Sequence, residues 1–245
     1  YGSYTEYNWE EEKSSFAQFD YHVNDKLTLT YGIRDYELSD VSKTYQYGII
    51  YMSDNGCDGI DPAGTQCAEL SGSESDTRQK FALSYKVNND LTVYTTRAAG
   101  YRPGGNQAPL PPFCSSDETA QETWGPRYNS DEAETTELGV KARGENYTAN
   151  VTWFQVDWDG IIISVTPGCG WSYNFNGGKA RTTGWEYEFT YDLTDAFSLD
   201  FTGSNMKAET SIDIESLGAA AGDRLPNTVE SQWNFGATYQ TVIMT

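Results

Sequence analysis

The chain has 245 residues, a formal net charge of -20 and a mean hydropathy of -0.63. This acidic balance argues against a nucleic-acid partner, which needs a basic protein face. No apolar run approaches the ~20 residues of a membrane-spanning helix. Aromatic residues make up 14% of the chain, which favours either the aromatic girdles of a transmembrane β-barrel or a soluble acidic β-sandwich that binds carbohydrate.

The first predicted hairpin runs from about Lys13 to Tyr36 and turns at Asn24-Asp25-Lys26. Apolar and polar residues alternate on both sides of this turn, which is the period of a strand with one apolar face. A segment rich in Gly, Ser and Asp follows, from about Glu37 to Asp76. It predicts a long loop, within which Tyr45 to Met52 could extend a strand.

The second and third predicted hairpins turn at Asn88-Asn89-Asp90 and at Gly144-Glu145-Asn146. A Pro-rich connection, residues 98–131, joins them. In the third hairpin the alternation changes phase where Trp153 and Phe154 are adjacent. Either a β-bulge or the aromatic girdle of a barrel explains this change.

The fourth predicted hairpin turns at Thr194-Asp195-Ala196 and shows the alternation most clearly. A ninth strand around Trp233 follows a Gly/Ala-rich loop. We expect the aromatic face of the hairpin to meet lipid and the polar face to meet a wet lumen. The two faces are Trp185, Tyr187, Phe189 and Tyr191 against Glu186, Glu188, Thr190 and Asp192.

The connections between hairpins run to roughly 15–40 residues, which is unusual inside a compact soluble domain. Barrels of bacterial outer membranes, in contrast, combine short periplasmic turns with long extracellular loops. The chain is therefore predicted to be all-β, an antiparallel transmembrane β-barrel segment of about nine strands. The four turns should lie on the periplasmic side and the long loops outside the cell.

Four cysteines, Cys57, Cys67, Cys114 and Cys169, fall in predicted loops. An even number of loop cysteines favours disulfides formed in an oxidising compartment. Three pairings are possible, of which Cys57–Cys67 with Cys114–Cys169 is the simplest. A zinc site is the weaker interpretation, because there is no CxxC pair and the single histidine, His22, lies in a predicted strand.

Six groups of residues occur in an order along the chain that resembles a known protein family. They are Phe16–Phe19 with Tyr31–Arg34, Ala99–Asn106, Glu137–Lys141, Trp153–Asp159, Asn176–Glu186 and Gly222–Asn227. No single group is specific, but together and in this order they resemble the β-barrel region of TonB-dependent outer-membrane receptors.

This resemblance implies a 22-stranded barrel in the bacterial outer membrane, filled by an N-terminal plug domain and energised through TonB. Residues 1–245 would form part of that barrel domain, and we expect the plug, the TonB box and the remaining strands outside them. The implied function is active uptake of a scarce nutrient such as a ferric siderophore. The implied partners are the lipid bilayer, the plug, TonB through the plug, and a small nutrient ligand. A passive porin-like channel and the soluble carbohydrate-binding β-sandwich are the alternatives.

Five residues are candidates for ligand contact. Tyr101 and Arg102 lie where a strand leaves the membrane and Arg102 could meet an anionic ligand or the plug, although a simple strand-end turn is the favoured explanation. Trp124, Trp171 and Tyr173 lie in predicted outer loops, where aromatic rings either stack on a ligand or pack on one another.

Catalytic chemistry is not predicted. Asp157-Trp158-Asp159-Gly160 lacks the later ligands of a calcium loop. Glu186 and Glu188 follow the alternation of a wet lumenal face, and a strand histidine offers no Ser-His-Asp arrangement. We therefore expect no catalytic residue, no bound metal, no cofactor and no enzyme activity.

Overall fold

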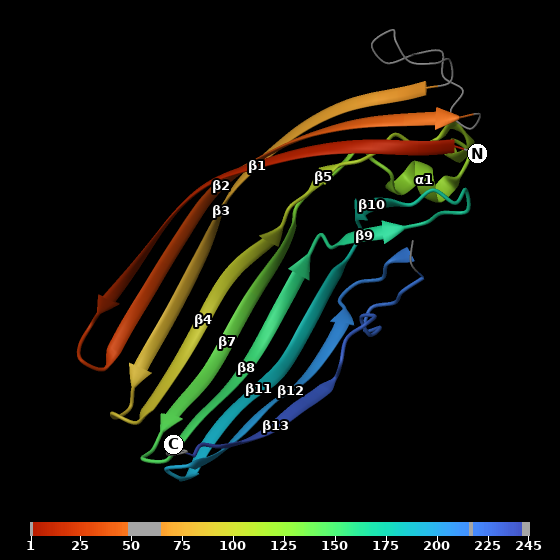
Figure 1. Ribbon diagram of the computed structural model, residues 1–245. Helices are drawn as coiled ribbons and strands as arrows, with labels where there is room; N and C mark the ends of the chain where they lie inside the picture. Colours follow the sequence, from red (N-terminus) through yellow and green to blue (C-terminus); the bar gives the residue numbers. More distant parts are fainter. Residues whose placement is uncertain (1, 49–64, 216–217, 242–245) are drawn as a thin grey trace, which may run out of the picture.

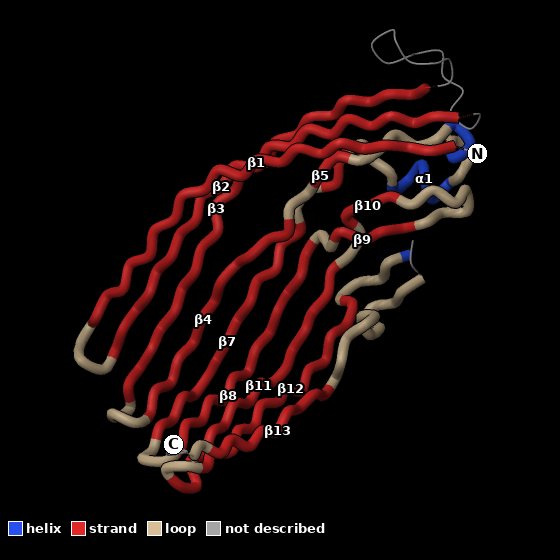
Figure 2. Tube along the Cα trace, in the orientation of Figure 1, coloured by secondary structure: helices blue, strands red, loops and turns tan. Residues whose placement is uncertain are grey.

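The computed structural model describes residues 2–48, 65–215 and 218–241, and it is dominated by one nine-stranded antiparallel sheet (Figures 1 and 2). The nine long strands follow one another along the chain, and each is hydrogen-bonded to the strands before and after it. They are β1 (Gly2–His22), β2 (Leu27–Gly48), β3 (Thr65–Lys86), β4 (Leu91–Arg102), β7 (Asp131–Arg143), β8 (Tyr147–Asp159), β11 (Lys179–Thr194), β12 (Phe197–Thr210) and β13 (Ser231–Tyr239).

Six short elements lie in the connections at one end of this sheet. Two strand pairs are formed by β5 (Gly105–Asn106) with β6 (Arg127–Tyr128), and by β9 (Ile162–Val165) with β10 (Tyr173–Asn176). The helical elements are the 3-10 turn η1 (Pro112–Cys114) and the α-helix α1 (Glu118–Thr123). Within the described residues, no helix is long and apolar enough to cross a bilayer.

The predicted count of nine strands and the four predicted tight turns are confirmed. Each turn lies at the opposite end of the sheet from the long connections (Figure 2). The side-chain oxygen of Asn24 accepts hydrogen bonds from the amides of Lys26 and Leu27, both at 2.9 Å. The side chain of Asn88 accepts one from the amide of Asp90, also at 2.9 Å. These local bonds explain why asparagine stands in two of the turns.

The predicted loop from Glu37 to Asp76 is wrong over most of its length. β2 continues to Gly48 and β3 begins at Thr65, so both strands run far beyond the predicted hairpins. Their pairing is unbroken from Leu27 opposite Tyr85 to Tyr47 opposite Thr65. Residues 37–45 and 68–76 carry polar side chains on both faces, so backbone pairing forms these parts of the strands without the apolar alternation that reveals a strand in sequence.

The pairing register sorts the side chains of the sheet into two faces, because residues directly opposite each other point the same way. We call the apolar part of the outer face the apolar belt. One of its rows crosses eight strands through Leu27, Tyr85, Val93, Val140, Val151, Tyr187, Gly203 and Trp233. The next row on the other, lumenal face runs through Lys86, Thr92, Lys141, Asn150, Glu188, Thr202 and Asn234.

Nothing in the described chain covers the apolar belt. Phe19, Tyr21, Trp233 and Phe235 are 61–74% exposed. The soluble β-sandwich alternative required these faces to pack on one another, so it is wrong. Above the belt, the outer face becomes charged through the ion pairs Arg97–Glu134 and Arg181–Asp157. Such a boundary is expected where a barrel wall passes from lipid into water.

The adjacent aromatics Trp153 and Phe154 do not mark a bulge. β8 pairs continuously with β7 and β11 through both residues, so Trp153 lies on the outer face and Phe154 on the lumenal face. Phe154 lies opposite Gly184, and a Cβ atom added to Gly184 would approach its ring to 2.8 Å. The absence of a side chain at Gly184 therefore makes room for a large ring on the polar face. The register instead shifts at Asp192–Thr194, beside a turn.

Two parts of the sheet separate between β3 and β4 (Figure 1). Their pairing ends at Lys80 opposite Ala98, although β3 continues to Thr65 and β4 to Arg102. The loop that follows β4 contacts β2 and β3 beyond this point. This separation places the end of β4 beside residues of β2 that are distant in sequence.

Candidate functional site

The two long connections after β4 and β8 fold together at the extracellular end of the sheet. We call residues 103–130 and 160–178 the outer-loop module. Its centre consists of the buried residues Cys114, Ala120, Val165 and Tyr173. Around them pack Leu110, Trp124, Cys169, Trp171 and Phe175. The module therefore has a small hydrophobic core of its own, although it consists of two separate loops.

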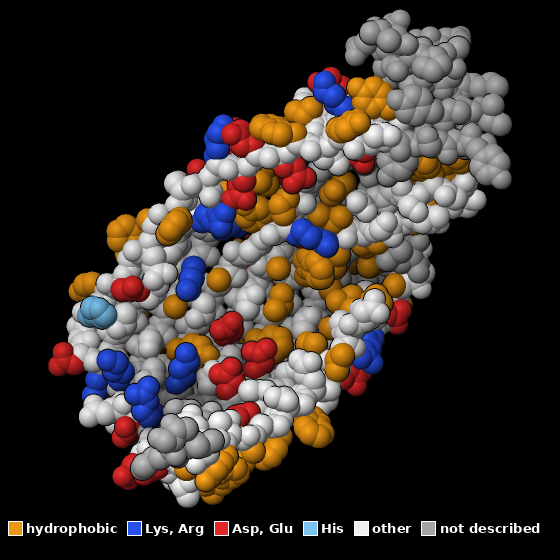
Figure 3. All heavy atoms as spheres, viewed as in Figure 1, with side chains coloured by type: hydrophobic (Ala, Val, Ile, Leu, Met, Phe, Trp, Pro, Cys, Tyr) orange, Lys and Arg blue, Asp and Glu red, His pale blue; other side chains and the backbone are white. Residues whose placement is uncertain are grey.

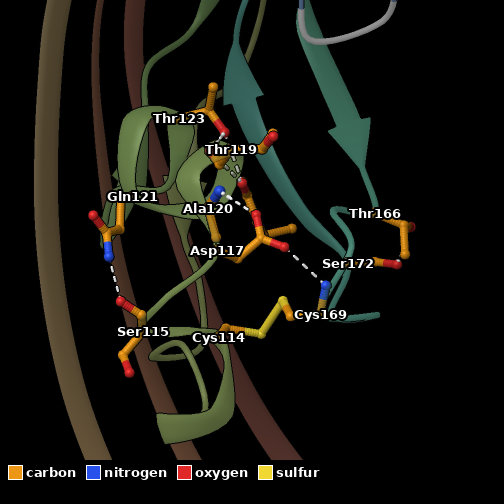
Figure 4. Close-up of a disulfide and its surroundings, with 11 residues drawn as sticks. Cys114, Ser115, Asp117, Thr119, Ala120, Gln121, Thr123, Thr166, Cys169 and Ser172 are labelled. Atoms are coloured by element: carbon orange, nitrogen blue, oxygen red, sulfur yellow. Dashed lines mark hydrogen bonds between the residues drawn. A yellow bond between two sulfur atoms is a disulfide. The ribbon is translucent and has the colours of Figure 1, made fainter.

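A disulfide between Cys114 and Cys169 joins these two loops (Figure 4). The Cα atoms of the two cysteines are 5.2 Å apart, and Cys114 is fully buried. Asp117 lies beside the bond. Its carboxylate caps α1 by accepting from the Ala120 amide at 3.1 Å, and it also accepts from the Cys169 amide at 2.9 Å. One side chain thus starts the helix and holds the opposite loop.

Gln107 forms a second link between the loops. Its buried side chain donates to the carbonyls of Gly125 at 2.6 Å and Asn174 at 2.9 Å, and it accepts from the Asn174 amide at 2.8 Å. The hydroxyl groups of Thr123 and Tyr173 are also 2.6 Å apart. Because these polar groups satisfy one another inside the module, they stabilise its core without a cost of unpaired burial.

The module is attached to the barrel wall through Asp40 on β2. This buried carboxylate accepts a hydrogen bond from the Asn106 amide at 3.2 Å and forms an ion pair with Arg127. Asn106 also donates through its side chain to the carbonyl of Leu70 on β3 at 3.1 Å. The extensions of β2 and β3, which the sequence did not reveal, are thus the support on which the outer loops rest.

Tyr101 lies at the separation between β3 and β4. Its ring stacks on that of Tyr36, with centroids 3.9 Å apart and an interplanar angle of 7°. The guanidinium group of Arg78 lies over both rings and forms ion pairs with Asp76 and Glu132. Burial raises the pKa of both phenols above the ordinary value.

The side chain of Arg102 points away from Tyr101 and forms hydrogen bonds with residues of the neighbouring strands. It donates to the carboxylate of Asp131 through Nε at 3.0 Å and Nη2 at 2.5 Å, and to the Ile162 carbonyl at 3.1 Å. Its guanidinium carbon lies 5.2 Å from the ring centroid of Trp158. Half of the side chain stays exposed, so Arg102 retains a face toward the lumen.

The five sequence candidates therefore form two groups. Tyr101 and Arg102 lie at the end of β4, and Trp124, Trp171 and Tyr173 lie together in the outer-loop module. Tyr173 is only 5% exposed and offers almost no surface to a ligand. Trp124 is partly exposed, and its indole nitrogen is enclosed without a hydrogen-bond partner among the described residues. The packing of rings on one another explains much of this aromatic cluster.

The remaining sequence candidates have structural partners or fall outside the description. Asp157 and Asp159 form ion pairs with Arg181 and Lys179. The described part of the chain holds no group of three or more His, Cys, Asp or Glu side chains suited to a metal ion. The predicted Cys57–Cys67 disulfide lies outside the described residues, because Cys57 does. The backbone of Cys67 belongs to β3, so its predicted placement in a loop is wrong.

Sequence reasoning missed the residues that assemble this end of the wall. Asp40, Gln107 and Asp131 each stand beside other polar residues in sequence, without a motif that would single them out. The only local signal was Asp117, which precedes the helical run Glu118–Thr123 as an N-cap residue should. The other partners are distant in sequence and meet only through the pairing of the strands.

Comparison with known proteins agrees with this architecture. Residues 1–243 match the family model described as TonB dependent receptor-like, beta-barrel. The pesticin receptor of Yersinia enterocolitica is 25% identical over 228 residues, which cover 92% of this chain and 30% of that protein. The chain therefore spans less than a third of the length of this relative.

Solved structures show the same fold. The ferric yersiniabactin uptake receptor of Yersinia pestis superposes with a TM-score of 0.77 at 17% identity, covering 97% of this chain and 32% of the receptor. The ferric-catecholate import receptor of E. coli K12 gives a TM-score of 0.68 at 18% identity, over 97% of this chain and 33% of the receptor. The sheet has an apolar outer belt, four short turns at one end and long loops at the other. The chain belongs to the TonB-dependent receptor-like β-barrel family, whose barrels lie in the bacterial outer membrane.

Proposed function

We propose that this chain forms part of the wall and outer mouth of a receptor that imports a ferric siderophore across the outer membrane. The transport would be driven through TonB, which would act on a plug domain of the same receptor. The support is family membership together with the names of similar proteins, among them receptors for ferric yersiniabactin and for ferric catecholates. No covalent chemistry is part of this proposal.

The observation that carries the proposal is the outer-loop module at the extracellular end of a belted wall. It presents Trp124 and Trp171 at its partly exposed edge. Both rings are partly exposed, and an exposed aromatic face suits a ligand that itself carries aromatic rings, as an aromatic iron chelator does.

The test expresses the full receptor in cells whose own copy of its gene has been deleted. These cells are then given a panel of radioactive ferric siderophores. Replacing Trp124 by Ala should weaken binding of the accepted chelate roughly threefold to tenfold, because aromatic contacts contribute about 0.5–1.5 kcal/mol. The matched control is Trp233→Ala on the apolar belt, which should leave binding unchanged. Unchanged binding in the Trp124 variant would remove the module from the ligand site.

The same assay distinguishes active transport from the passive porin-like channel. Uptake through a TonB-driven receptor should stop when TonB is deleted or the membrane potential is collapsed, while binding at the cell surface persists. Uptake that continues at the same rate without TonB would refute active transport and favour the porin-like channel.

A further inference from the structure

The strand β3 has a free edge beyond the apolar belt. It pairs with β4 only from Lys80 to Lys86, although the strand itself begins at Thr65. No other strand of the described chain pairs with β3 on this side. The outer part of β3 therefore has β2 on one side and no described strand on the other. We call residues 69–79 the β3 edge.

Alternate residues of the β3 edge direct their backbone groups away from β2. In an antiparallel sheet, the amide and carbonyl of one residue face one neighbouring strand, and those of the next residue face the other. Beside the turn, Lys86 donates its amide to the Lys26 carbonyl on the β2 side, at 2.8 Å. Val87 donates to the Leu91 carbonyl on the β4 side, at 2.9 Å. The odd-numbered residues of β3 therefore face β4 and, where β4 has separated, the free edge.

The amide of Thr77 agrees with this orientation. It donates to the carboxylate of Asp76, its neighbour in sequence, at 2.6 Å. A side chain thus supplies the acceptor that a paired strand would otherwise supply. The odd-numbered residues also have exposed side chains, all of them polar: Glu69, Ser71, Ser73, Ser75, Thr77 and Gln79. The edge therefore offers a row of backbone donors and acceptors beside exposed polar side chains.

The β3 edge lacks the features by which proteins usually block an unpaired strand. These features include lysine, proline and β-bulges on the edge. Residues 69–79 contain no lysine and no proline, and their register with β2 is unbroken. They extend over roughly 35 Å, which is enough to pair with a strand of about ten residues. The edge is thus long, regular and unguarded.

The surroundings of the edge are acidic. Asp35 on β2 accepts a hydrogen bond from the Thr77 hydroxyl at 3.0 Å, and it takes part in none of the ion pairs among the described residues. Arg78 forms ion pairs with two carboxylates at once, those of Asp76 and Glu132. Figure 3 shows several Asp and Glu side chains where β1, β2 and β3 run toward the outer end. Carboxylates therefore outnumber the cations that neutralise them here.

These observations select one kind of partner. An extended polypeptide presents amides and carbonyls at the spacing of the edge, whereas a sugar, a lipid or a small chelate has no such ladder. A second copy of this chain would place like charges opposite each other, because its own edge is equally acidic and the chain has a net charge of -20. A basic segment complements the edge in both backbone and charge.

We propose that the β3 edge binds an extended, basic segment of another protein outside the cell, by adding it to the sheet as a further strand. The backbone of the segment pairs with the odd-numbered residues from Glu69 to Gln79. Its lysine or arginine side chains lie near Asp35 on one face of the sheet and near Asp76 on the other. This site is separate from the proposed import of a ferric siderophore and gives the receptor a second ligand, a polypeptide.

The first experiment measures the binding of synthetic peptides to the intact receptor in lipid nanodiscs. The probe is a ten-residue peptide in which threonine and lysine alternate. A peptide of the same sequence with every backbone amide methylated keeps the charges and loses the donors, so it should bind at least tenfold more weakly. A peptide with glutamate in place of lysine should not bind. Equal binding of the methylated peptide would reveal adsorption by charge alone and overturn the proposal.

The second experiment compares Ser73→Pro with its matched control Ser73→Ala. The amide of Ser73 faces the free edge, so proline removes a donor from the edge and none from the ladder with β2. Ser73→Pro should weaken binding of the lysine peptide at least tenfold, and Ser73→Ala should leave it unchanged. Asp35→Lys should weaken the lysine peptide and strengthen the glutamate peptide, which a misfolded receptor would not show. Unchanged binding in Ser73→Pro, or no exchange of preference in Asp35→Lys, would refute strand addition.

Hydrogen exchange resolved to single residues identifies any other occupant. In the receptor alone, the amides of Ser71, Ser73 and Ser75 should exchange rapidly. Those of Gly72 and Glu74 face β2 and should be protected. The lysine peptide should slow exchange at the three serines at least tenfold. Protected serines without peptide would mean that the receptor covers its own edge, and a receptor dimer that Ser73→Pro dissociates would place a second copy there. Either result would overturn the proposal.

Discussion

Arg102 and Asp131 face each other on β4 and β7, and the buried carboxylate of Asp131 also accepts a hydrogen bond from the Ile162 amide at 3.1 Å. Asp131 is 2% exposed, whereas the Arg102 side chain is half exposed. The pair therefore connects the end of β4, the start of β7 and the strand β9 of the outer-loop module.

Loss of this pair should destabilise the outer end of the wall. In Arg102→Ala the buried Asp131 carboxylate loses its charged partner, at an expected cost of about 1–3 kcal/mol in the free energy of unfolding. Arg97→Ala is the matched control on β4, since the Arg97–Glu134 pair is exposed to solvent and its loss should hardly change the stability. Thermal unfolding of the full receptor in detergent measures both. Equal effects would show that burial of Asp131 is unimportant.

The two faces of β11 should respond oppositely to a positive charge. Phe189 lies between Ala149 and Phe201 on the apolar belt, whereas Thr190 lies between Thr148 and Asp200 on the lumenal face. Phe189→Arg should cost roughly 2–4 kcal/mol if the site is near the membrane midplane, and Thr190→Arg should be tolerated beside Asp200. Reversible refolding of the full receptor into lipid vesicles gives the two values. Similar tolerance at both positions would contradict the assignment of faces.

The Cys114–Cys169 disulfide should protect the outer loops while contributing little to the barrel. Because the paired strands already hold the ends of both loops, the bond restricts only the outer-loop module. In Cys114→Ser/Cys169→Ser, a local loss of about 2 kcal/mol would increase proteolysis within residues 103–130 about 30-fold. Cleavage is followed on intact cells, with the barrel melting temperature measured in parallel. A large fall in that temperature with unchanged cleavage would refute this separation.

Two lumenal glycines should differ in their tolerance of alanine. A Cβ atom at Gly184 would lie 2.6 Å from the carbonyl oxygen of Asn205 and 2.8 Å from the Phe154 ring, so the strands must move. Gly184→Ala should cost about 1–3 kcal/mol by overpacking. At Gly32 the nearest side-chain atom is 3.4 Å away, and Gly32→Ala should be neutral or slightly stabilising. Denaturant unfolding of both variants provides the comparison.

The membrane-embedded part of the fold could be predicted because lipid on one side and water on the other impose strict alternation. Tyr187 and Glu188 exemplify this, since each falls in the row that its polarity predicts. Above the belt both faces meet water, so residues such as Ser39 and Ser73 gave no sign that β2 and β3 pair there. The pattern of side-chain polarity therefore cannot predict strand extensions that depend on backbone pairing alone.

The candidate site was predictable in composition but not in arrangement. Its aromatic residues stood out, yet their partners did not, because Asp40 meets Arg127 and Gln107 meets Asn174 across long stretches of chain. Short elements such as α1 depend on such contacts, since six residues are too few to form a stable helix alone. Tyr101 and Arg102 were chosen together and point to different partners, because neighbours on a strand face opposite ways.

The unequal lengths of the strands slant the outer edge of this sheet. β1, β2 and β3 have 21–22 residues, or roughly 70 Å of extended chain, whereas β13 has 9 residues, or roughly 30 Å. The wall therefore extends farther beyond the apolar belt at β1–β3 than at β13. The outer-loop module is attached to the tall part, through Asp40 on β2 and the Leu70 carbonyl on β3, so the height of these strands sets how far the module stands from the apolar belt.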